Sequence, residues 1–304
     1  MALPNSLKLE LDAARAAIAK VRELNLEQAS IDELKEALIP VFRGYRVTAP
    51  RFQPGLEIFR ARRLEKPVLV RELLHPPEGV APLGRANREG ASVLYCCTAR
   101  EPSFFELAPS VGDTLVFSKW VTTAPLLVNH VGYTSQAFER LGSGRRRASW
   151  SNRPVEDHGE ANGEIATFLA DTFAQRIPAN ERYRYKLSVA IAEKLYAADL
   201  FDALLYPSIA MRANSDNLAV KPGYADTNLR FLRAEFAKID AVRDLELDIT
   251  VLDTAVAVDA DGRIQWRGRL DQWVLRNKGD QLTMSVENGR WVGRDTAGHI
   301  VGPE

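Results

Sequence analysis

From residue 55 onward the chain carries short apolar runs typical of β-strands. Three of them, residues 56–62, 92–98 and 114–121, are separated by stretches that hold Gly and Pro. Helical periodicity follows at 165–173 and 187–195, and then two compact apolar runs at 203–208 and 218–221 predict further strands. Short strands combined with separate helices in this way predict an α+β fold.

The first 48 residues predict a helical extension. Leu11, Ala14, Ile18 and Val21 recur at helical spacing and form one apolar stripe. A second helix is expected to begin at a capping box, Ser30-Ile-Asp-Glu, and to be shortened or kinked by Pro40. Packing of this hairpin on the body of the protein is favoured over exposure to a partner. We expect three parts: the extension at 1–48, a core domain at 49–240 and a β-rich tail at 241–304.

Three further local predictions can be made. Residues 142–163, which carry the arginines 145–147 between Gly and Ser, predict a long solvated surface loop. Asn180 is suited to cap the helix around 187–195. In the tail, Gly262 and Gly279 are candidate hairpin turns, and Trp266, Trp273 and Trp291 are candidate packing anchors between strands.

Composition excludes several classes of function. The 304 residues hold 40 Lys+Arg and 40 Asp+Glu, so no basic excess favours nucleic acid as a partner. No secretory signal and no apolar window long enough for a membrane span is found, which predicts a cytoplasmic protein. The adjacent Cys96 and Cys97 are expected to be buried, reduced and unreactive. The four scattered histidines form no metal-ligand pattern, and neither a P-loop nor a dinucleotide-binding glycine motif is present.

Four short pieces stand out because of their order. They are Phe59-Arg60-Ala-Arg62, then Gly84-Arg85 with the run Val93-Leu-Tyr95, then Glu106 eleven residues after Tyr95, and finally Tyr206-Pro-Ser208 with Asn217 beyond it. No piece is specific alone, but this order together with the spacing from Arg85 to Glu106 is hard to obtain by accident.

The pattern resembles the RES-domain family, named for its Arg, Glu and Ser signature, over about residues 55–235. The resemblance implies an ADP-ribosyltransferase-like core of small antiparallel and mixed sheets with helices, which uses NAD as substrate and no metal. Members are typically toxins of toxin–antitoxin pairs that deplete NAD, and some transfer ADP-ribose to a protein. This chain departs from compact members in a longer segment at about 108–200.

Physical chemistry supports these roles independently for three of the residues. Cleavage of the nicotinamide–ribose bond creates positive charge on the sugar, which a nearby carboxylate stabilises, and Glu106 is the candidate. The pyrophosphate favours guanidinium donors, for which Arg60 and Arg85 are the candidates. Each has a structural alternative: Glu106 as a surface side chain, Arg60 at a solvated strand edge, and Arg85 as a bridge from a loop to a carboxylate.

Three more residues complete the predicted site. The Tyr95 ring offers a face for nicotinamide, and with Glu106 and Arg85 it forms the expected catalytic set. Ser208 is expected to place its hydroxyl on the nicotinamide ribose or on Glu106, and Asn217 is expected to bind NAD. The structural alternative for Tyr95 is a plain core side chain, and the alternative for Ser208 is a hydroxyl at a turn or strand end.

Three functions remain open at this point. The first is an NAD-degrading enzyme, the second a mono-ADP-ribosyltransferase acting on a protein, and the third a non-catalytic interaction module. An NAD-degrading chain needs restraint, which an antitoxin protein, the helical extension or a homo-oligomer could supply. Export into another cell by a route without a signal is left open.

Overall fold

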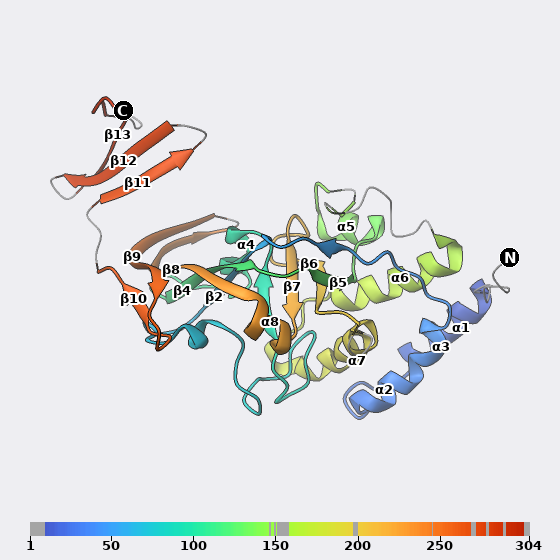
Figure 1. The fold of residues 1–304 in the computed structure, drawn as a ribbon. Coiled ribbons are helices and arrows are strands. Elements are labelled where there is room, and N and C mark those ends of the chain that lie inside the picture. The colour runs from blue at the N-terminus through green and yellow to red at the C-terminus, as the bar shows by residue number, and fades with distance from the viewer. Residues whose placement is uncertain are drawn as a thin grey trace, which may run out of the picture.

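The computed structural model describes residues 10–145, 147–148, 150, 158–196, 200–244, 246–268, 272–277, 280–287 and 290–300. A large mixed sheet forms the centre, with helices gathered toward the N-terminal side and a separate small sheet near the C-terminus (Figure 1). The chain is therefore α+β, as predicted. The described helices are α1 (Leu11–Arg22), α2 (Ile31–Ala37), α3 (Ile39–Phe42), α4 (Arg100–Phe105), α5 (Ser135–Leu141), α6 (Glu160–Phe173), α7 (Tyr185–Leu195) and α8 (Pro222–Asn228), with 3-10 turns η1 (Val70–Leu73) and η3 (Ala179–Arg184).

The strand order in the large sheet is β1-β5-β6-β7-β3-β2-β4-β8-β9-β10. β5 and β6 pair in parallel, and the other described pairs are antiparallel. The bounds are β1 (Arg51–Phe52), β2 (Glu57–Arg62), β3 (Leu94–Cys97), β4 (Thr114–Thr122), β5 (Leu126–His130), β6 (Ala203–Pro207), β7 (Asp216–Val220), β8 (Leu229–Arg243), β9 (Glu246–Val258) and β10 (Ile264–Trp266). The small sheet holds β11 (Gln272–Asn277), β12 (Asp280–Glu287) and β13 (Arg290–Arg294).

Both faces of the central strands are buried, because side chains alternate between two apolar cores. Leu204, Tyr206 and Ala219 contribute to the core that holds the helices. Leu205 and Leu218, one position along, belong to the core on the opposite face. The five predicted strands β2, β3, β4, β6 and β7 are confirmed, and they form the centre of the sheet.

The N-terminal helices pack on the body, as predicted. α1 contacts α6 and α2 contacts α7, and Figure 1 shows the three helices beside that helical layer. The predicted capping box is present, with the Ser30 side chain accepting from Glu33 N and the Glu33 side chain accepting from Ser30 N. Pro40 lies in the first turn of α3, which separates that short helix from α2.

Two local predictions were wrong. The surface loop expected to reach residue 163 ends earlier, because α6 begins at Glu160 and includes Gly163. Asn180 does not cap α7, because it lies within the 3-10 turn η3, which runs directly into that helix. A preceding helical turn thus takes the place of a side-chain cap.

Of the two longest strands, β8 was not predicted, whereas β9 lies in the tail that was expected to be β-rich. β8 and β9 form a hairpin whose side chains alternate irregularly between buried and exposed, so neither strand gives a clear apolar run in the sequence. The tail beyond it is partly as expected: Gly262, at φ 79°, makes the turn into β10, and Trp266 packs on the apolar core. Gly279 and the side chains of Trp273 and Trp291 lie outside the described residues.

Candidate active site

An open cavity of about 430 Å³ lies where β2, β3 and β7 meet α4 and the start of α7. Five of the six predicted site residues line it: Arg60, Arg85, Tyr95, Glu106 and Asn217. They come from segments that are widely separated in the sequence. The pairing of β3 with both β2 and β7 brings them together.

Glu106 follows α4 directly, and its side chain is exposed in this cavity. Ser208 Oγ donates to Glu106 Oε1 at 2.5 Å, and Asn217 Nδ2 donates to the same oxygen at 2.7 Å. Among the described residues no donor contacts Oε2. One carboxylate oxygen is therefore held in place while the other is available to a ligand.

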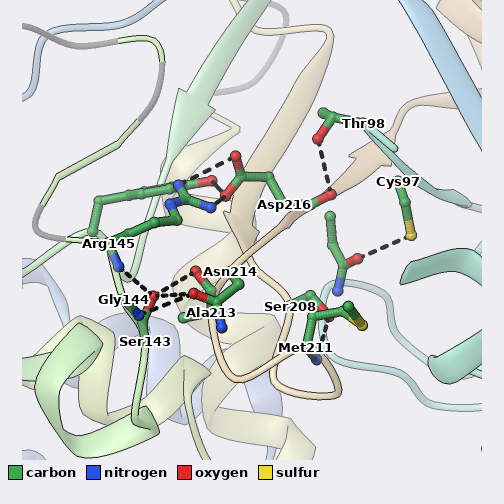
Figure 2. A network of polar contacts seen from close by, with 12 residues as sticks. Cys97, Thr98, Ser143, Gly144, Arg145, Ser208, Met211, Ala213, Asn214 and Asp216 are labelled. Carbon is green, nitrogen blue, oxygen red and sulfur yellow. Dashed lines mark hydrogen bonds and ion pairs between the residues drawn. The ribbon is translucent and has the colours of Figure 1, made fainter. Parts of the chain in front are cut away.

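Ser208 supports the carboxylate from behind. It is buried just after β6 and does not line the cavity. Its hydroxyl oxygen accepts from Met211 N at 3.2 Å (Figure 2), and its hydroxyl proton is directed toward Glu106. Of the two roles considered for Ser208, the geometry favours the contact with Glu106.

Arg60 is a cation without a matching anion. Its guanidinium donates to Tyr95 O through Nη1, while its buried Nε has no hydrogen-bond partner. Burial lowers the pKa of Arg60 to about 10, with the positive charge of Arg62 as a smaller cause, so the group stays charged at neutral pH. No acidic side chain in the described part of the chain forms an ion pair with it. Arg60 as a whole is half-buried and lines the cavity, and a guanidinium in this state is suited to an anionic ligand.

Arg85 is held by backbone carbonyls. It donates to Phe173 O and, at 2.9 Å, to Gln175 O, both at the end of α6, and its Cζ lies 5.5 Å from the centre of the Tyr185 ring. The structural alternative for Arg85 was a bridge from a loop to a carboxylate. It does bridge two loops, but its acceptors are carbonyls, so its charge is not neutralised.

The Tyr95 hydroxyl organises the turn that carries Arg85. It accepts from Ala86 N at 2.8 Å and donates to Asn87 Oδ1 at 2.7 Å. A side chain at Gly84 would put its Cβ 2.3 Å from Asn87 Oδ1 and 2.8 Å from the Tyr95 hydroxyl, so only glycine fits there. Burial raises the pKa of Tyr95, which therefore stays protonated. Its half-buried ring remains part of the cavity wall.

The other lining residues, which were not predicted as site residues, include three arginines and a tyrosine: Arg62, Arg63, Arg182 and Tyr185. The position of Arg62, two residues after Arg60 on one strand, was a usable signal because such residues share a face. Nothing in the sequence relates Arg182 to this cavity, where it donates to Leu83 O at 2.5 Å. The lining thus includes five arginines and one carboxylate, which gives the cavity a strongly positive character.

The prediction that Arg145 lies in a solvated run was wrong. Its Nη1 and Nη2 pair with the buried Asp216 carboxylate at 2.9 and 3.3 Å, and Tyr133 also donates to this carboxylate at 3.0 Å. Figure 2 shows this pair beside a second contact, in which Ser143 Oγ bonds Asn214 Oδ1 at 3.0 Å. These contacts fix the loop to β7, the strand that carries Asn217. The prediction failed because the sequence pattern does not reveal the buried partner Asp216.

Both cysteines are buried, as predicted. Burial raises the pKa of Cys96 to about 12 and also raises that of Cys97. In the described part of the chain, no group of three or more His, Cys, Asp or Glu side chains could hold a metal ion. No described helix is long and apolar enough to cross a membrane.

Comparison with known proteins gives one clear relationship. The family model of the RES domain matches residues 57–249, which is more than half of the chain and includes all six predicted site residues. A search of curated proteins finds no match.

Proposed function

The chain belongs to the RES-domain family, and we propose that it binds NAD in the cavity between β2, β3 and α4 and cleaves the nicotinamide–ribose bond. The products would be nicotinamide and ADP-ribose, or an ADP-ribose derivative formed with another small nucleophile. Such an enzyme acts as a toxin by depleting cytoplasmic NAD.

The observation that carries this proposal is the unpartnered buried Nε of Arg60 in a cavity with five arginines. A pyrophosphate supplies two negative charges and several acceptor oxygens, which such a set of donors needs. Arg85 adds a charge held in one place by the Phe173 and Gln175 carbonyls. A pyrophosphate bound here would offset the free energy that is lost when the Arg60 guanidinium is removed from water.

Glu106 supplies the electrostatic part of the reaction. When the bond between ribose C1′ and the nicotinamide nitrogen breaks, its electron pair leaves with nicotinamide, which becomes neutral, and positive charge remains on the ribose. Glu106 Oε2, which has no donor among the described residues, stabilises that charge and accepts from a ribose hydroxyl. Water then attacks C1′ and releases one proton. The Tyr95 ring, fixed through its hydroxyl, offers a face for nicotinamide.

Restraint of this activity is proposed to come from an antitoxin protein or a second copy of the chain. None of the residues of α1, α2 or α3 is among those that line the cavity. The described part of the helical extension, from residue 10 onward, therefore does not line the site, which favours an external partner.

The test is to incubate the purified chain with NAD and follow free nicotinamide by chromatography, beside the variant Glu106→Gln. We expect the variant to fold normally and to lose at least about 10²-fold in rate, the scale of losing one electrostatic stabiliser. Glu101→Gln is the matched control, because Glu101 lies on α4, the helix that Glu106 follows, and is exposed without lining the cavity.

Nicotinamide release that Glu106→Gln retains at the wild-type rate would remove Glu106 from the mechanism. No release by a folded wild-type chain, with or without phosphate and with or without a cell lysate as acceptor source, would contradict the proposal. The second product, whether ADP-ribose, a phosphorylated form or a labelled protein, identifies the nucleophile.

A further inference from the structure

Cys97 on β3 and Asn217 on β7 are paired across the two strands. No contact between these two side chains was predicted from the sequence. Cys97 Sγ donates to Asn217 Oδ1 at 3.1 Å, and both side chains are buried. Figure 2 shows the thiol of Cys97 in this polar network. Cys97 also lines the cavity that holds Glu106.

The orientation of the Asn217 amide follows from its two neighbours. Glu106 Oε1 lies 2.7 Å from Nδ2, and because an ionised carboxylate only accepts, the amide must present its NH₂ group to it. Oδ1 then points to the other side, where it meets Cys97 Sγ. An amide oxygen needs a donor there, and a protonated thiol provides one.

Burial keeps the Cys97 thiol protonated, because it raises the pKa of this group well above its ordinary value. Cys97 is therefore a hydrogen-bond donor at neutral pH and a poor nucleophile. If the amide turned over, its oxygen would face the Glu106 carboxylate, and two acceptors would oppose each other. The hydrogen bond from the Cys97 thiol to Oδ1 stabilises the observed orientation of the amide against this flip.

We propose that Cys97 is a positioning residue: its thiol holds the Asn217 amide so that Nδ2 stabilises Glu106 Oε1 and leaves Oε2 for the substrate. Cys97 acts through Asn217 and has no covalent part in the reaction. The kinetic side of this inference rests on the proposed NAD cleavage, whereas the orientation of the amide can be measured without it.

The first test compares Cys97→Ala, Cys97→Ser and Cys96→Ala in nicotinamide release. Cys97→Ala should lower kcat by roughly three- to tenfold, the scale of one neutral hydrogen bond, with a smaller change in KM. Cys97→Ser keeps a donor and should recover most of that loss. Cys96→Ala removes the same volume from the neighbouring position of β3, which also lines the cavity but whose thiol contacts Leu218 O and not Asn217, and should lower kcat less than Cys97→Ala does.

A double-mutant cycle separates positioning from general loosening of the site. In the Asn217→Ala background, adding Cys97→Ala should cause no further loss in kcat, because the group it orients is gone. Independent, additive losses in the cycle, or a Cys97→Ser variant as impaired as Cys97→Ala, would overturn the proposal.

The side-chain amide signal of Asn217 in NMR provides a readout that does not need catalysis. The signal is assigned by its absence in Asn217→Ala. It should shift in Cys97→Ala, return toward its original position in Cys97→Ser and stay unmoved in Cys96→Ala. A wild-type chain that fails to cleave NAD but shows these shifts would contradict the proposed function alone, while an unmoved signal in Cys97→Ala would overturn the role of Cys97.

Discussion

Arg60 and Arg85 show how differently two arginines of one cavity are supported. Arg85 has two carbonyl acceptors and an aromatic neighbour, so it contributes to the stability of the free protein. Arg60 has one carbonyl acceptor and a buried Nε without a partner, so its burial costs free energy. We therefore expect an anionic ligand to offset this free energy when it binds to the Arg60 guanidinium.

Arg60→Met should therefore separate stability from binding. The unfolding midpoint of the free protein should stay the same or rise, since Met is similar in length and removes a buried charge that lacks an anion. NAD affinity should fall by roughly 10- to 100-fold, corresponding to about 1.5–3 kcal/mol for lost hydrogen bonds from a charged group. Calorimetric titration with NAD in the Glu106→Gln background, where turnover is suppressed, measures the second effect.

Arg85→Met is the informative comparison for that experiment. It leaves the carbonyls of Phe173 and Gln175 without their donor, so its unfolding midpoint should fall. An Arg60→Met protein that is destabilised like Arg85→Met, or that binds NAD as well as the wild type does, would show that Arg60 is structural.

At the scale of elements, the site strands could be predicted because each is a short apolar run. β2, β3, β6 and β7 were found in this way, and the motif order placed Arg60 and Tyr95 on two of them, with Asn217 just before the run that became part of β7. What could not be predicted is what each polar group touches. The carbonyls that hold Arg85 lie 88 and 90 residues away at the end of α6, and no local pattern relates them to it.

Arg145 illustrates the same limit. A run of arginines between Gly and Ser is typical of a solvated loop, but Asp216, 71 residues later, accepts two hydrogen bonds from it. The side chains of Arg145 and Asp216 are 18% and 6% exposed. Such a pair depends on the way the loop folds back over β7, which is a property of the whole sheet and not of the loop sequence.

Loss of one member of this pair should be costly. Asp216→Ala leaves the Arg145 guanidinium and the Tyr133 hydroxyl without their acceptor, and we expect a loss of about 3 kcal/mol in the free energy of unfolding. The double variant Arg145→Met/Asp216→Leu should recover a large part of it, because no unpaired charge remains. Urea unfolding measures both values.

An exposed pair provides the control for that measurement. Arg212 and Asp244 lie 2.7 Å apart with side chains 49% and 71% exposed, so Asp244→Ala should change stability by less than about 1 kcal/mol. Equal losses for Asp216→Ala and Asp244→Ala would show that burial does not strengthen the Arg145–Asp216 pair.

At the scale of the whole molecule, the helical extension lies outside the family match but inside the main core. The match begins at residue 57, whereas Ile18, Leu34 and Leu38 pack in one cluster with Phe168 of α6 and Ile191 of α7. α6 in turn holds the cavity residue Arg85 through the Phe173 carbonyl, and α7 contributes Tyr185 to the cavity lining. From residue 10 onward, the extension therefore supports the helical layer behind the site and does not line the site itself.

This arrangement gives opposite expectations for stability and activity. Leu34 is fully buried, so Leu34→Ala should lower the free energy of unfolding by roughly 2–5 kcal/mol through lost burial and a cavity. Nicotinamide release per folded molecule should stay at the wild-type value, because none of the α2 residues lines the cavity. Glu36→Ala on the exposed face of α2 is the control and should change neither quantity. Release that rises in Leu34→Ala while the protein remains folded would instead identify the extension as the restraint on the enzyme, and the proposed external partner would lose its main support.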